Sequence, residues 1–96
     1  MAMNIRQLLL DVDKAVTRPS LIEIAAALNT CGGVDAVNIT VEEIDIETVG
    51  MNVTIEGDNM NYDEITKAIE STGAVVHSLD QIAIGNRIIP RILRVR

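Results

Sequence analysis

Apolar and polar residues alternate most regularly between Gly33 and Gly57, with a period of two. The apolar alternates are Val37, Ile39 and Val41 in the first half and Met51, Val53 and Ile55 in the second. The polar alternates are Asn38, Thr40 and Glu42, then Asn52, Thr54 and Glu56. Strict alternation with many β-branched residues predicts two half-buried strands, and the acidic segment between them predicts the turn of a hairpin.

The segment before the hairpin predicts a strand and a helix. Residues 5–12 form a short apolar run that predicts a strand, followed by a loop over residues 13–20. Pro19 is placed to open a helix, and Gly32 and Gly33 are placed to end it. The apolar stripe of this helix is Leu21, Ile24, Ala25, Leu28 and Cys31.

The segment after the hairpin predicts a second helix and a last strand. Asn61 followed by Glu64 matches a capping box, and Gly73 ends the helix that follows. Residues 74–84 predict a strand that bends near Asp80, and Gly85 begins a turn.

This order of strand, helix, strand, strand, helix and strand predicts a ferredoxin-like α+β fold. We expect a four-stranded antiparallel sheet with two helices on one face, and with the first strand and the second half of the hairpin at its centre. Residues 1–86 then form the ferredoxin-like domain, and residues 87–96 form an extended C-terminal arm.

The sheet face opposite the helices has no cover from this chain in the predicted fold. Asn38, Thr40, Asn52 and Thr54 line it, with Gln7, Asp11, Ser78 and Asp80 as expected neighbours. Such a polar face is either a solvated surface or a platform for a ligand. The candidate ligand-binding residues are Asp11, Asp13, Asn38, Asn52, Thr54 and Asp80.

Charge is distributed unevenly along the chain. There are 14 Asp and Glu residues against 8 Lys and Arg, for a net charge of −6. Half of the basic residues (Arg87, Arg91, Arg94 and Arg96) lie in the arm, which has no acid. An acidic body repels nucleic acid, and the open face lacks the aromatic side chains on which RNA bases stack. We therefore predict no nucleic-acid partner.

The arm is more apolar than a free terminus needs to be, because Ile88, Ile89, Ile92, Leu93 and Val95 separate its arginines. It could fold back as an extra edge strand, add to the edge of a neighbouring copy, or bind an anionic polymer or membrane. The second reading explains both its apolar and its basic residues, and repeated head-to-tail contacts would close a ring. The candidate oligomer contacts are Arg87, Ile89, Arg91, Leu93 and Arg94.

The sequence offers few candidates for catalysis. His77 is the only histidine and is expected to be partly buried, while Ser78 beside it is expected on the opposite face of the strand. Cys31, the only cysteine, is expected in the core. The acids near the hairpin turn could hold a divalent cation, but no calcium-binding loop spacing occurs. We expect no cofactor and no enzymatic activity; a small metal-dependent enzyme is an alternative.

Two family resemblances add to this reading. The segments LLLDVDKAVTRPSLIEIAAAL and VDAVNITVEEI resemble the start of an ACT domain, an amino-acid-sensing module, with Ser20 in place of the glycine of that family. The segments VNITVEEIDIET, VTIEGDNMNYDEITKAIESTG and VVHSLDQIAIG resemble an archaeal family catalogued as domain of unknown function 211. That resemblance implies a ferredoxin-like fold and oligomeric assembly, and it implies no activity.

Together these observations predict a non-catalytic, cytoplasmic homo-oligomer, either a regulatory or small-ligand-binding module or a purely structural assembly protein. The N-terminal segment matches neither a signal peptide nor a membrane span, so we predict no membrane partner.

Overall fold

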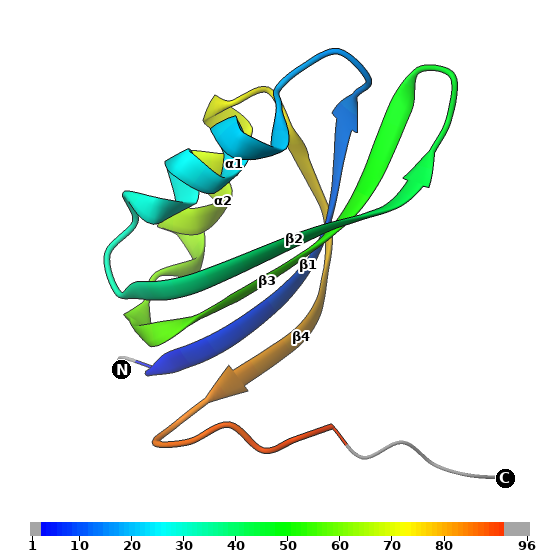
Figure 1. Cartoon of the computed structure of the whole chain (residues 1–96). Helices are drawn as coiled ribbons and strands as arrows, with labels where there is room; N and C mark the ends of the chain where they lie inside the picture. The colour runs from blue at the N-terminus through cyan, green and yellow to red at the C-terminus, as the bar shows by residue number, and fades with distance from the viewer. Residues whose placement is uncertain (1–2, 92–96) are drawn as a thin grey trace, which may run out of the picture.

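The computed structural model describes residues 3–91 and has the predicted ferredoxin-like architecture (Figure 1). Both helices lie on one face of a four-stranded antiparallel sheet with the order β2-β3-β1-β4. The elements are β1 (Ile5–Ala15), α1 (Leu21–Asn29), β2 (Val34–Ile44), β3 (Thr48–Met60), α2 (Tyr62–Ser71) and β4 (Val75–Ile84). The two central strands are β1 and β3, as predicted.

Strand β1 is longer than the predicted strand, which ended at Val12. The extra residues continue the pairing with β3, where Asp13 is opposite Gly50 and Lys14 is opposite Val49. The side chain of Lys14 is only 8% exposed, and its ammonium donates hydrogen bonds to the carbonyl oxygens of the next two residues. Its charged end therefore keeps hydrogen-bond partners while its aliphatic part extends the buried face of β1.

Helix α1 begins at Leu21, two positions after Pro19, which we predicted to open it. Ser20 is the N-cap, and its hydroxyl accepts a hydrogen bond from the backbone N–H of Glu23 at 3.1 Å. A serine at this position satisfies one of the free N–H groups of the first turn. The helix ends at Asn29, so Cys31 follows the helix and is nevertheless buried.

Asn61 caps helix α2 as predicted and accepts a hydrogen bond from the N–H of Glu64 at 2.9 Å. The carboxylate of Glu64 accepts a hydrogen bond from the backbone N–H of Gly32 at 3.1 Å. This contact connects the start of α2 to the segment that follows α1, so Glu64 links the two helical units.

Strand β4 contains two irregularities that the sequence only partly indicated. Its pairing with β1 shifts register around His77 and again around Asp80, where a bend was predicted. Each shift leaves one extra residue in β4, which is the pattern of a β-bulge. Gln81, Ile82 and Ala83 then pair regularly with β1, and a third shift, with the extra residue in β1, precedes the pair of Ile84 with Ile5.

The core lies between the sheet and the two helices and is almost entirely aliphatic. Its residues that are buried without measurable exposure are Leu8, Leu10, Val12, Ile24, Leu28, Met51, Val53, Ile55, Ile65 and Ile69. The alternate residues of β1 and β3 supply the sheet side, and α1 and α2 supply the other side.

Two glycines allow the start of β2 to approach β3 closely. A Cβ atom built on Gly57 would lie 1.9 Å from the carbonyl oxygen of Gly33. That oxygen accepts a hydrogen bond from the N–H of Asp58 at 2.9 Å. Neither backbone segment can give way easily, so the end of the hairpin requires glycine here.

We therefore expect the substitution Gly57→Ala to destabilise the protein by about 1–3 kcal/mol or more, the range for forcing atoms into a packed site. Gly50→Ala is the matched control, because a Cβ atom on Gly50 would meet its nearest neighbour at an ordinary 3.6 Å. Urea denaturation of both variants measures the difference. Equal midpoints for the two variants would contradict the steric explanation.

Candidate functional site

The open face of the sheet consists of cross-strand rows of side chains. One row runs through all four strands as Thr40, Asn52, Asp11 and Ser78, because each is opposite the next in the sheet register. The next row is Asn38, Thr54, Leu9 and Gln81. The predicted neighbours Asp11 and Ser78 are thus confirmed on this face, and Leu9 is an apolar residue at its centre that the sequence reading missed.

At the hairpin end of this face lies an acidic depression of about 250 Å³. Its lining residues are Asp11, Asp13, Glu42, Glu43, Asp45, Thr48, Gly50 and Asn52. Five of these residues are acids, and within residues 3–91 no lysine or arginine lines the depression. The carboxylates come from β1, from the end of β2 and from the hairpin turn, so the fold joins two acidic segments that are separate in the sequence.

A register shift in β2 brings consecutive glutamates to the same depression. Consecutive residues of a regular strand point to opposite faces. Between Val41 and Glu43 the pairing of β2 with β3 shifts, so that both Glu42 and Glu43 line the depression. The side-chain amide of Asn52 donates a hydrogen bond to Glu42 at 2.6 Å and holds this carboxylate over β3.

Gly50 provides the room for the depression. It is opposite Asp13 in β1 and Glu43 in β2. A Cβ atom on Gly50 would lie 3.6 Å from Oδ1 of Asp13 and 3.8 Å from Cβ of Glu43. A larger side chain would therefore project between the two acids. An isolated glycine among alternating residues was the available sequence signal for a hollow here.

The structure brings together three of the six predicted ligand-binding residues. Asp11, Asp13 and Asn52 line the acidic depression, whereas Asn38 and Thr54 form a cross-strand pair outside its lining. The sixth residue, Asp80 on β4, accepts a hydrogen bond of 2.7 Å from the hydroxyl of Ser78 on the same strand.

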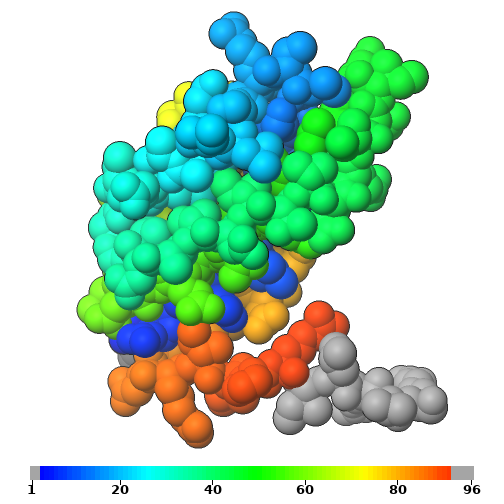
Figure 2. Space-filling model, viewed as in Figure 1, coloured from blue at the N-terminus to red at the C-terminus, as the bar shows by residue number. Residues whose placement is uncertain are grey.

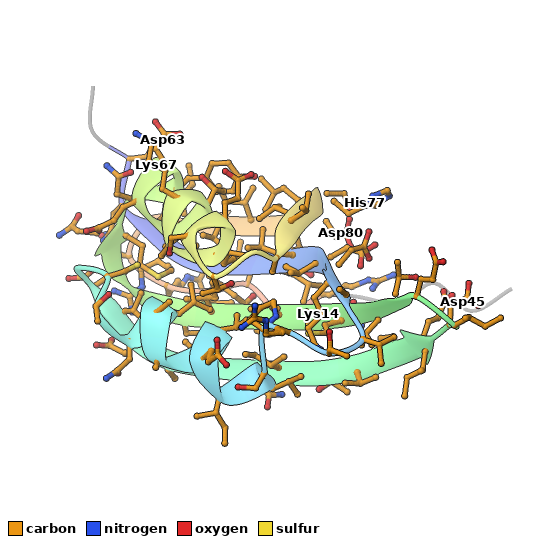
Figure 3. The ribbon with its side chains drawn as sticks, turned by 90° about the horizontal axis from the view of Figure 1, so that it is seen from above. Lys14, Asp45, Asp63, Lys67, His77 and Asp80 are labelled. Atoms are coloured by element: carbon orange, nitrogen blue, oxygen red, sulfur yellow. The ribbon has the colours of Figure 1, made fainter. Side chains whose placement is uncertain are left out.

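His77 is exposed, so the prediction of a partly buried histidine was wrong. The bulge in β4 turns it toward β1, where its Nδ1 lies 3.7 Å from Oδ2 of Asp13. The two side chains are 65% and 47% exposed. Figure 3 shows His77 and Asp80 on the side of the molecule where Asp45 marks the hairpin turn, far from Asp63 and Lys67 on α2.

The described part of the C-terminal arm, residues 87–91, is outside the regular strands. It follows Gly85, whose N–H donates a hydrogen bond to the carbonyl oxygen of Asn4 at 2.9 Å. Figure 2 shows residues 87–91 beneath the body of the domain in this view. Arg87 and Ile89 lie beside the last residues of β4. The predicted contacts Leu93 and Arg94 lie outside the described residues.

Among residues 3–91, no group of three or more His, Cys, Asp or Glu side chains has an arrangement suited to holding a metal ion. A divalent cation at the acidic turn therefore stays a prediction. In the same part of the chain, no helix is long and apolar enough to cross a membrane.

The fold and this face define a ferredoxin-like α+β domain with one sheet face uncovered by its own helices. The chain belongs to the family described as uncharacterized ArCR, domain of unknown function 211, whose model matches residues 6–94. It is 43% identical over 89 residues to an uncharacterized protein of Methanocaldococcus jannaschii, covering 93% of this chain and 91% of the relative. The predicted resemblance to domain of unknown function 211 is thereby confirmed, whereas the resemblance to ACT domains stays a prediction.

Cys31 is confirmed as a core residue. Desolvation by burial raises the pKa of its thiol, and the nearby charge of Glu64 raises it further. Because the thiolate is the reactive form, both the high pKa and the lack of access suppress its chemistry.

We expect Cys31 to resist alkylation by iodoacetamide in the native protein at pH 8 and to react fully in denaturant. Mass spectrometry of the two samples measures the modified fraction. Rapid, complete modification of the native protein would contradict the buried position of the thiol.

Proposed function

We propose that this protein is a non-catalytic homo-oligomeric module in which the acidic depression of one copy receives the basic arm of another. The observation that carries this proposal is the unbalanced charge of the depression: its lining, in the part of the chain that the structure describes, has five carboxylates and neither lysine nor arginine. Clustered like charges repel one another, and a positively charged partner relieves that repulsion.

The position of the arm favours another copy as its acceptor. The arm starts beside Asn4, at the beginning of β1, whereas Asp11 and Asp13 lie toward the end of that strand. At about 3.3 Å per residue, these points are on the order of 30 Å apart. An arm that served its own depression would have to run back along almost the whole sheet.

Stable association through the arm needs both the ion pairs of its arginines and the burial of its apolar side chains. Exposed ion pairs contribute only about 0.2–1 kcal/mol each, so its arginines alone give weak association. Burying an isoleucine side chain contributes about 1.5–3 kcal/mol. Ile89 is strongly exposed, so its burial against a neighbour would add to the contribution of Arg87 and Arg91.

The local contacts of the polar groups support a non-catalytic role. The Ser78 hydroxyl is engaged with Asp80, and His77 is paired with Asp13 in an exposed position. The hydroxyl of Ser78 donates its hydrogen bond to Asp80 and not to His77, so these two neighbours do not form a serine–histidine pair for nucleophilic catalysis.

Removal of residues 87–96 tests the proposal directly. We expect light scattering to give a mass several times 10.4 kDa for the full chain and a monomer for the truncated chain. The double substitution Asp13→Asn and Glu43→Gln should also lower the mass measured by light scattering, because it removes two negative charges from the depression. Glu70→Gln on α2 is the matched control, since it removes an exposed acid elsewhere. Truncated and full chains with the same subunit number would refute the proposal.

A regulatory site for a small cationic ligand is the second candidate function. The converging carboxylates around a space of about 250 Å³ favour it. A bound ligand stabilises the native state by about 2.7 kcal/mol at a hundred times its Kd.

If the depression binds a small cation, we expect arginine, spermidine, Ca²⁺ or Mg²⁺ to raise the melting temperature of the protein. The substitution Glu43→Gln should reduce this increase in melting temperature. A thermal-shift assay at fixed ionic strength measures this. The absence of any shift would leave self-assembly as the role of the depression. Stoichiometric metal in the purified protein would instead favour a metal-dependent enzyme.

A further inference from the structure

Both edges of the sheet have the features of strands that pair with another chain. Strands β2 and β4 have 11 and 10 residues, about twice the usual strand length. Proteins normally protect free edges with Lys or Pro, and neither strand contains either residue. The register shifts leave a regular segment in each edge strand, from Gln81 to Ala83 in β4 and from Ala36 to Val41 in β2.

Both edges have exposed apolar residues on the same face of the sheet. In β4, Leu79 and Ile82 are opposite the buried residues Leu10 and Leu8 of β1. In β2, Val41 is opposite the buried Met51 of β3. Cross-strand partners share a face, so these exposed side chains lie on the helix side, beyond the cover of the helices.

The strand directions allow the sheet to continue from one copy to the next. With antiparallel neighbours in the order β2-β3-β1-β4, the two edge strands run in opposite directions. A second copy in the same orientation beside β4 therefore presents its β2 antiparallel to that strand. The helix layers of both copies then lie on the same side, and the apolar edge residues meet beneath them.

Charge favours this pairing of unlike edges over a symmetric one. Strand β2 has three acids, Asp35, Glu42 and Glu43, and no basic residue. Strand β4 has one acid and leads directly into the arm with Arg87 and Arg91. An antiparallel pairing of β2 with another β2 would place Asp35 of one copy near Glu42 and Glu43 of the other, whereas β4 brings only one acid to the contact.

We propose that copies of this chain associate head-to-tail through the edge of β4 in one copy and the edge of β2 in the next, which extends the sheet across the subunits. This inference rests on the proposed self-association and adds a second contact, between the sheet edges of neighbouring copies. A contact between two different edges is heterologous, so it repeats until the assembly closes into a ring or grows into a filament.

Two edge variants of the full chain test this inference. Ile82→Glu blocks the β4 edge, and Val41→Lys blocks the β2 edge, at side chains that are 44% and 37% exposed. We expect each variant alone to be a monomer. An equimolar mixture should form a dimer of about twice 10.4 kDa, because each variant keeps the edge that the other lacks.

Three outcomes would separate the alternatives. Dimers formed by each variant alone would indicate a symmetric contact and overturn the inference. If both variants kept the mass of the wild-type assembly, edge pairing would also be overturned, while assembly through the arm would still stand. A monomeric wild-type chain would refute the proposed function itself. Urea midpoints confirm that the variants fold, and Ile84→Glu with Ile44→Lys provide a second pair at more exposed positions.

Discussion

The antiparallel pairing of β1 with β3 is the constraint on which the rest of the structure depends. It aligns the buried alternates of both central strands beneath the two helices, and the same register places Asp11 opposite Asn52 and Asp13 opposite Gly50 on the other face. A shift by one residue would exchange the two faces. The pairing that forms the core therefore also forms the floor of the acidic depression, and the stability and the proposed function of the sheet have a common origin.

Much of this arrangement could be predicted from the sequence, because alternation in the hairpin specifies which side chains share a face. The assignment of Asn52 and Asp11 to the open face needed only that periodicity and the strand order. The convergence of Glu43 with Asp13 could not be predicted, since it depends on the extension of β1 and on a register shift in β2. His77 was misplaced for a similar reason: a bulge in β4 breaks the alternation from which its burial was inferred.

The distribution of charge connects the fold with the proposed assembly. The acids are concentrated where β1, β2 and β3 meet at one end of the sheet, and the basic arm leaves from the other end. A single copy thus has two complementary regions that its own geometry keeps apart. Long edge strands with exposed apolar residues add a second, uncharged reason for copies to associate, which does not depend on the arm.

Sedimentation equilibrium of the intact chain over a range of concentrations tests the central claim, self-association, most directly. The account predicts a mass that is a multiple of 10.4 kDa and that falls as salt screens the contacts between the arm and the acidic depression. A single species of 10.4 kDa at every concentration and ionic strength would contradict it.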